Sequence, residues 1–222
     1  MQRVFHILCV LLTSYATNGF AAANLCQILL NSTNAQKIPT STSQVLVVHA
    51  TTGFNADIMA CQRSGKTWHP LFASSIKGVI GTNGLAAIGE KKEGDRKTPA
   101  GIYPIGDLFG SKPLAVQMDF RFITPDDKFV DDVGSPFYNT WINGPTEAKS
   151  YELMRTESYR MGAVVNYNMN PIVPGAGSAI FIHLKGTTPN YSTAGCIAMD
   201  EKSLSSILHW FDKKQRPYVF IE

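Results

Sequence analysis

Short apolar runs separated by turn-forming residues dominate the chain, and they predict a β-rich domain. The clearest run, residues 44–50, is rich in β-branched side chains and predicts a buried strand. Further strands are predicted at 161–168 and 217–221, and a hairpin over 56–73. Glycines recur through 78–110, so long helices are not expected there.

One stretch near the end of the chain has the periodicity of an amphipathic helix. Its apolar residues follow the i, i+3, i+4, i+7 spacing of a single face: Leu204, Ile207, Leu208 and Phe211. Asp200 or Ser203 would cap its N-terminus. A shorter helix is predicted within 150–160. Residues 111–146 are rich in Pro, Asp and Gly, and they predict a long surface excursion of the kind that often binds ligands.

The N-terminal residues have the organisation of an export signal. Arg3 supplies a positive charge, an apolar stretch too short to cross a bilayer follows, and small alanines mark the expected cleavage point. We therefore expect a secretory signal peptide at 1–23, a polar lead-in segment at 24–43 and one folded domain at 44–222. An uncleaved N-terminal anchor is the alternative.

Length and charge narrow the function classes. The chain has 222 residues and a formal net charge of +3, which suits one domain with a substantial core. No run of Lys and Arg accompanies this small charge, so no nucleic-acid partner is expected. Beyond the N-terminal stretch no apolar run is long enough to cross a membrane, so we expect membrane contact only during export.

The cysteines suggest one bridge and one free thiol. Cys9 leaves with the signal peptide, and the odd number that remains implies a free thiol or an intermolecular bond. The simplest assignment pairs Cys26 with Cys61 and leaves Cys196 to react. Such a bridge would stabilise the fold by about 3–4 kcal/mol in the chain-entropy model. The alternative is two buried, unpaired thiols, since spacing does not establish their geometry.

A histidine and a cysteine end and begin two apolar runs within 177–199. The first run ends at His183, a polar loop with Gly, Pro and Asn follows, and the second run opens at Cys196. A β-hairpin here would bring imidazole and thiol together at one end of a sheet. Because a thiol is a poor nucleophile until it is deprotonated, and a neighbouring His is its usual base, the segment predicts a Cys/His acyl-transfer site.

The neighbouring residues suit this chemistry. The small residues 193–195 let a substrate approach the backbone, and the amides of Gly195 and Cys196 are candidates to hold an oxyanion. His183 would take the thiol proton and later return one to a leaving amine. Because the loop contains no Asp or Glu, a backbone carbonyl such as that of Leu184 is the candidate acceptor for the other ring nitrogen.

Other interpretations of these residues are less favoured. A buried cysteine is often a small hydrophobe, and a lone histidine is often a core residue. A Ser/His hydrolase is disfavoured because Ser192 lacks the glycines of a nucleophile elbow. Four histidines show no metal-ligand spacing, and no CxxC pair exists, so no metal or organic cofactor is expected: His49, His69, His183 and His209.

The pattern His183…Thr193-Ala-Gly-Cys196 resembles the active-site signature of YkuD-type L,D-transpeptidases, the ErfK/YbiS/YcfS/YnhG family. That signature is a His, a variable loop, then Ser or Thr, any residue, Gly and Cys. The segments similar to other parts of the family are 94–104, 131–139 and 164–183. The resemblance implies a mainly β, YkuD-like β-sandwich catalytic domain over 44–222 with a packed C-terminal helix.

The resemblance also implies a monomeric enzyme of cell-wall biogenesis, exported to the periplasm or cell wall. Cys196 would attack a carbonyl at an L-centre of a peptidoglycan stem peptide, expel a terminal D-amino acid and form a thioester. An amine of a second stem would resolve that thioester. The residues implied in substrate contact are Thr193, Ala194, Tyr138, Asn139, Asn168 and Lys185.

Two positions depart from the family pattern. Leu184 stands where many members have Gly or Ser, and Ala198 stands where many have Arg. The grip on a substrate carboxylate would then fall to another cation, for which the candidates are Arg96, Lys97, Arg121 and Lys185.

Three rival functions stay open. An L,D-carboxypeptidase would resolve the same thioester with water. A cell-wall-binding module would carry an inactive site, and a cysteine peptidase would cleave all-L proteins.

Overall fold

The computed structural model describes residues 20–222. The expected signal peptide, residues 1–23, lies outside the described residues except for its last four, which begin a helix. No helix in the described range is both long enough and apolar enough to cross a membrane.

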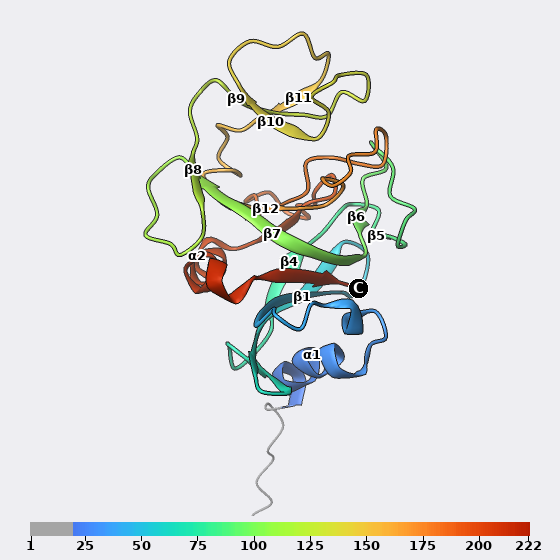
Figure 1. Cartoon of the computed structure of the whole chain (residues 1–222), viewed down its shortest axis with the longest axis vertical. Helices are drawn as coiled ribbons and strands as arrows, with labels where there is room; N and C mark the ends of the chain where they lie inside the picture. The colour runs from blue at the N-terminus through green and yellow to red at the C-terminus, as the bar shows by residue number, and fades with distance from the viewer. Residues whose placement is uncertain (1–19) are drawn as a thin grey trace, which may run out of the picture.

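Over residues 20–222, strands make up most of the regular structure, with two helices and two 3-10 turns (Figure 1). The helical elements are α1 (Phe20–Asn31), η1 (Ala35–Lys37), α2 (Glu201–Trp210) and η2 (Lys213–Gln215). The strands are β1 (Gln44–Ala50), β2 (Asn55–Ser64), β3 (Thr67–Pro70), β4 (Ile76–Val79), β5 (Leu85–Ala86), β6 (Thr98–Pro99), β7 (Gly101–Gly110), β8 (Phe120–Phe122), β9 (Asp127–Val130), β10 (Thr140–Asn143), β11 (Tyr151–Leu153), β12 (Met161–Val165), β13 (Phe181–Leu184), β14 (Ile197–Met199) and β15 (Tyr218–Ile221).

The large sheet closes on itself. Its strands follow the order β1-β15-β7-β12-β13-β14-β4-β2-β3, and β2 also pairs with β1. Closure removes most of the exposed strand edges that an open sheet would present. The prediction of a mainly β domain is confirmed. The strand predicted at 44–50 is β1, and the hairpin predicted over 56–73 is β2 with β3.

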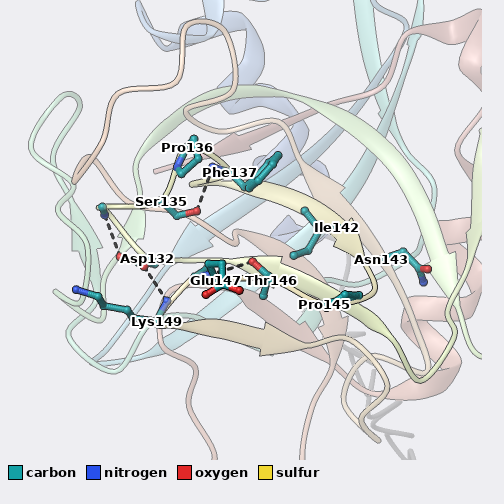
Figure 2. Close-up of a pocket in the computed structure, with 12 residues that line it drawn as sticks. Asp132, Ser135, Pro136, Phe137, Ile142, Asn143, Pro145, Thr146, Glu147 and Lys149 are labelled. Atoms are coloured by element: carbon teal, nitrogen blue, oxygen red, sulfur yellow. Dashed lines mark hydrogen bonds between the residues drawn. The ribbon is translucent and has the colours of Figure 1, made fainter.

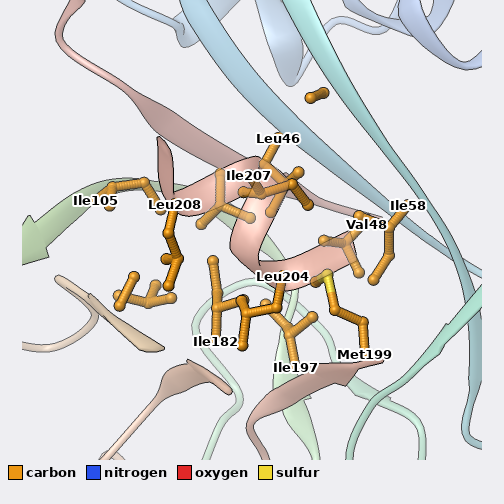
Figure 3. Close-up of a cluster of buried hydrophobic side chains, with 14 of the residues drawn as sticks. Leu46, Val48, Ile58, Ile105, Ile182, Ile197, Met199, Leu204, Ile207 and Leu208 are labelled. Atoms are coloured by element: carbon orange, nitrogen blue, oxygen red, sulfur yellow. The ribbon is translucent and has the colours of Figure 1, made fainter. Parts of the chain in front are cut away.

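Helix α2 packs its apolar face onto inward-facing side chains of the sheet (Figure 3). Leu204, Ile207 and Leu208 are fully buried among residues of β1, β2, β13 and β14. Burial of each such side chain contributes about 1.5–3 kcal/mol. Of the two candidate caps, Asp200 is the one used, because its carboxylate accepts the Ser203 N–H at 3.0 Å. The packed C-terminal helix is therefore confirmed.

The lead-in segment expected at 24–43 contains most of α1 and all of η1. Helix α1 packs against the outer face of β1 and β2, at the lower end of the molecule in Figure 1. Its buried residues Leu25, Cys26 and Leu29 recur at helical spacing within a largely apolar stretch. Cys26 forms the expected disulfide with Cys61 of β2, and Cys196 is a free, buried thiol.

The excursion predicted at 111–146 contributes β9 and β10 to a separate small sheet, which β11 completes and which we call the flap sheet. It projects from the large sheet at the top of Figure 1. The short helix predicted within 150–160 is wrong, because that segment supplies β11, in which Tyr151 pairs with Val130 and Glu152 with Phe129. Cross-strand pairing outweighs the weak helical propensity of so short a segment.

Asp127 holds the flap sheet together. Its carboxylate accepts hydrogen bonds from Thr124, from the Trp141 indole at 2.9 Å and from the Asn143 amide at 3.1 Å. Burial alone would raise the pKa of Asp127, but these donors outweigh it and hold the pKa below its ordinary value. The carboxylate therefore stays ionised and fully bonded.

Candidate active site

Strand alternation places the predicted nucleophile and base on one face of the large sheet. In β13 the side chains of Ile182 and Leu184 enter the main core, whereas Phe181 packs in the cluster between the large sheet and the flap sheet. His183 follows the same alternation and shares the face of Phe181. Cys196 belongs to that same cluster, so thiol and imidazole approach from one side.

The expected hairpin between His183 and Cys196 is wrong, because β13 and β14 run parallel. Ile182 pairs with Ile197, and His183 pairs with Ala198. The intervening loop therefore crosses back to the start of β13 before β14 begins. In this register Cys196 stands two residues from the partner of His183, a step of about 3.3 Å per residue along the strand.

Both side chains open onto one pocket of about 450 Å³. Cys196 is 6% exposed and His183 is 3% exposed, so only a small part of each residue is accessible from the pocket. The other lining residues come from the flap sheet, from the turn after it and from the loop before the cysteine: Glu152, Leu153, Thr156, Ser158, Tyr159, Tyr191, Ser192, Thr193 and Ala194.

The thiol of Cys196 is protonated at rest. Its Sγ donates to the Ala179 carbonyl at 3.2 Å and accepts from the Phe181 N–H at 3.3 Å. Burial raises the pKa of Cys196 well above its usual range, and the charge of Glu152 acts in the same direction. The Phe181 N–H and the charge of Lys91 oppose this shift without reversing it.

The imidazole of His183 is fixed as a neutral base. Its Nδ1 lies 2.9 Å from the Leu184 carbonyl oxygen, the acceptor expected from the sequence. Because a carbonyl only accepts, Nδ1 carries the hydrogen and Nε2 is left unprotonated. Burial lowers the pKa of His183 to about 4, and the Tyr159 ring packs edge-on against it at 5.1 Å between centroids.

One of the two predicted oxyanion donors already has a hydrogen-bond acceptor within the turn before Cys196. Thr193 Oγ1 accepts the Gly195 N–H at 3.1 Å and donates to the Cys196 carbonyl at 2.6 Å. The Gly195 amide thus already donates to Thr193, and its expected role as an oxyanion donor stays a prediction. Within the described chain the Cys196 N–H has no hydrogen-bond acceptor, so it is the donor available to an oxyanion.

Gly195 is required by its backbone conformation and by the close approach of a neighbouring segment. Its φ is +150°, and an added Cβ would meet the Lys97 carbonyl oxygen at 3.0 Å. The segment that approaches is braced by Thr98, whose hydroxyl donates to the Gly195 carbonyl at 2.7 Å and accepts from Gly81 N–H at 2.8 Å. Residues 81–98 therefore support the back of the cysteine turn.

Of the six residues expected to contact substrate, only Thr193 and Ala194 line this pocket. Tyr138 donates its hydroxyl to Glu93 at 2.6 Å, and Asn139 donates to the carbonyls of Tyr167 and Asn168.

The last two expected contacts also lie elsewhere. The Asn168 side chain donates to the Val173 and Gly177 carbonyls, at 3.0 and 2.9 Å, and Lys185 is exposed outside the lining. Asn168, Tyr138 and Asn139 hold the loops around the pocket through hydrogen bonds within the protein. None of these three residues, nor Lys185, lines the pocket that contains the thiol.

The candidate cations for a substrate carboxylate also lie outside the pocket lining. Arg121 stacks over the Trp141 ring at 5.0 Å, and Arg96 is exposed. Lys91, which sequence reasoning missed, is the buried cation of this region, with its Nζ 2.6 Å from the Asp95 carboxylate. Its charge acts on the thiol but is already paired.

A larger cavity, of about 870 Å³, lies in the flap region (Figure 2). It is lined by residues 132–149 of the excursion, which include most of the segment expected on the substrate side. The Asp132 carboxylate accepts the backbone N–H groups of Gly134 and Lys149 and so fixes one rim, as Figure 2 shows. Neither Cys196 nor His183 reaches this cavity.

Sequence reasoning missed Glu152 and Tyr159, which line the catalytic pocket. They were hidden by the helix predicted over 150–160, since a helix would have spread these side chains around its axis. The signal in the sequence was the apolar, polar, apolar alternation of Tyr151, Glu152 and Leu153, which is typical of a short strand.

Comparison with known proteins agrees with this geometry. The family model YkuD, which describes the L,D-transpeptidase catalytic domain, matches residues 50–219. No curated protein matches the chain.

Proposed function

The chain belongs to the YkuD family of L,D-transpeptidase catalytic domains, and on this premise we propose that it is a peptidoglycan L,D-transpeptidase with Cys196 as nucleophile. The observation that carries the proposal is the shared pocket, in which a buried thiol and an imidazole with a free Nε2 face the same cavity. The family match and this pair support each other, because the family signature falls on these two residues.

In the acylation step, Cys196 Sγ attacks the carbonyl carbon at an L-centre of a stem peptide. The thiol proton passes to His183 Nε2 as the C–S bond forms, and the carbonyl oxygen becomes an oxyanion held by the Cys196 N–H. The C–N bond then breaks, and the imidazolium gives its proton to the departing D-amino acid. A thioester and a neutral imidazole remain.

Because burial favours the neutral form of both groups, the proton transfer accompanies attack instead of preceding it. The Leu184 carbonyl supports this order, since it accepts from Nδ1–H and so stabilises the imidazolium formed during the step. The pair therefore resembles a general-base arrangement more than a preformed thiolate–imidazolium pair.

In the second step an amine of another stem attacks the thioester, and the thiolate leaves with a proton returned through His183. An L,D-carboxypeptidase would use water here, with the same acylating residues. Export to the periplasm or cell wall is part of the proposal, because stem peptides are found there. The Cys26–Cys61 disulfide supports it, since such bonds persist in oxidising compartments.

The test is to incubate the protein with stem peptides and a labelled D-amino acid. Incorporation of label indicates transfer, whereas shortened stems alone indicate hydrolysis. Cys196→Ala is the matched control and should abolish both products. A carbapenem should add once to the wild-type protein on intact mass and not to Cys196→Ala. Absence of both stem chemistry and adduct would favour a wall-binding module, and cleavage of all-L proteins would favour a peptidase.

A further inference from the structure

The flap sheet contributes a carboxylate to the catalytic pocket. Glu152, in β11, is half-buried and lines the pocket together with Cys196 and His183. It accepts a hydrogen bond from the Tyr159 hydroxyl. None of the salt bridges among the described residues involves Glu152. The catalytic pocket therefore holds an acidic group without a cationic partner.

A second carboxylate lies on the same face of the flap sheet. Glu152 pairs with Phe129 of β9, and Asp131 follows Phe129 by two residues, so strand alternation directs both acids to one side. That side faces β13, because the Phe129 ring packs edge-on against Phe181 at 5.0 Å. The Oδ1 atom of Asp131 is buried and has no hydrogen-bond partner in the described part of the chain.

Neither Glu152 nor Asp131 has a cationic partner among the salt bridges of the described residues. A buried carboxylate oxygen that is neither paired nor hydrogen-bonded is unfavourable, and it favours a ligand that supplies donors. Burial raises the pKa of Glu152, and the charges of Asp131 and Glu93 add to the shift. A primary ammonium brings three donors and one positive charge, and so it can pair with the Glu152 carboxylate that lines the pocket.

We propose that Glu152, with Asp131 behind it, forms an ammonium-binding subsite of the catalytic pocket. This inference rests on the proposed function, which supplies the thioester beside it. Two ammonium groups have the required chemistry, namely that of the amine acceptor and that of a diamino side chain on the donor stem. In either case the subsite selects substrates that carry a primary amine close to the reacting carbonyl.

The acceptor case gives a balanced reaction. The bound ammonium transfers one proton to the Glu152 carboxylate and becomes a nucleophilic amine. Its nitrogen attacks the thioester carbon and gives a second proton to His183 Nε2, after which the C–S bond breaks. The imidazolium returns that proton to Sγ, and Glu152 releases its proton to solvent. An amide, a thiol and one free proton result from the thioester and the ammonium.

The experiment measures how the thioester partitions between an added amine acceptor and water. Glu152→Gln keeps the shape of the side chain and an acceptor for the Tyr159 hydroxyl, but it removes the charge. We expect this variant to lower the ratio of aminolysis to hydrolysis about tenfold. Tyr159→Phe is the matched control, because it removes the same hydrogen bond and leaves the carboxylate. Tyr159→Phe should change the rates of aminolysis and hydrolysis by the same factor, so that their ratio stays constant.

A second arm distinguishes the two ammonium sources. Acylation is compared for donors with a free and with an N-acetylated side-chain amine. If the donor's ammonium occupies the subsite, wild type prefers the free amine and Glu152→Gln loses that preference about tenfold. Binding of a diamino acid to Cys196→Ala, with and without Glu152→Gln, adds a readout that needs no catalysis.

The proposal is overturned if Glu152→Gln changes neither the partition nor the donor preference. It is also overturned if Tyr159→Phe shifts the partition as much as Glu152→Gln does, because Glu152 would then act by positioning Tyr159. Failure of the wild-type protein to form any thioester would instead contradict the proposed function, and the binding measurement on Cys196→Ala would still decide the subsite.

Discussion

The hydroxyl of Thr98 donates a hydrogen bond to the carbonyl oxygen of Gly195 at 2.7 Å, and Thr98 is fully buried. The Gly195–Cys196 peptide is trans, so its N–H points away from its C=O. By holding the oxygen toward residues 81–98, Thr98 therefore directs the Cys196 N–H to the opposite side of the turn. A residue nearly a hundred positions away in the sequence thus orients the candidate oxyanion donor.

Replacing Thr98 with Val should slow acylation by about tenfold, a fraction of the loss seen when an oxyanion donor is removed outright. Thr98→Ser keeps the hydroxyl and should restore most of the rate. The measurement is the rate of carbapenem or stem acylation, divided by the rate of alkylation with iodoacetamide, which forms no oxyanion. An equal fall in both rates would mean that Thr98 supports the fold and not the oxyanion.

The lowered pKa of His183 should make the folded protein less stable in acid. The loss of unfolding free energy grows with the difference between the pKa in the folded chain and the pKa in the unfolded chain. The folded-state pKa is about 4 and the unfolded value is about 6.5, so between these pH values the unfolded chain binds more protons. Stability contributed by the neutral imidazole is complete above pH 6.5 and is lost as pH falls toward 4. The difference amounts to at most about 3 kcal/mol.

The measurement for His183 is urea unfolding at several pH values between about 4 and 7, compared with His183→Gln. The variant should lose less stability over this interval, whereas carboxylates such as Asp95 and Asp127 affect both proteins alike. Acylation in the wild type should retain its neutral base until the pH approaches the folded-state pKa of about 4. Parallel stability curves for the two proteins would contradict the displaced pKa.

Residue types in the sequence were enough to predict the thiol and the imidazole that share the pocket, and the disulfide. Chemistry limits the residues that can act as a thiol and its base, and only a few of each were present. The Leu184 carbonyl could be proposed because the loop contains no acid. The relative direction of β13 and β14 could not be predicted, because both are short, fully buried apolar runs, and such runs look the same whether they pair parallel or antiparallel.

Contacts made by distant segments were the part that could not be predicted. Glu152 and Thr98 reach the site through the pairing of β11 with β9 and through the packing of 81–98 behind Gly195. Neither contact leaves a periodic signal near Cys196. Helix α1 was missed for a related reason, since its buried face is defined by packing against the outer face of β1 and β2.

Removing the disulfide should weaken the fold with little effect on the chemistry. Cys26 and Cys61 lie in the cluster beneath α1, which is separate from the cluster that contains Cys196. The double variant Cys26→Ser, Cys61→Ser should lose about 2–4 kcal/mol of unfolding free energy. Carbapenem acylation below the unfolding transition should stay within about twofold of wild type. A folded variant that no longer acylates would show that α1 supports the site.

The protonated thiol predicts slow and strongly pH-dependent alkylation of the free protein. Because the pKa of Cys196 lies above its usual range, the thiolate fraction should rise about tenfold per pH unit from 7 to 9, and the iodoacetamide rate should follow it. Glu152→Gln removes a negative charge near the sulfur, so it should lower the pKa and speed alkylation severalfold at fixed pH. Intact mass against time measures both rates, with Cys196→Ala as the blank. A rate that is flat across this range would indicate a preformed thiolate, and acylation would then begin from the ion pair.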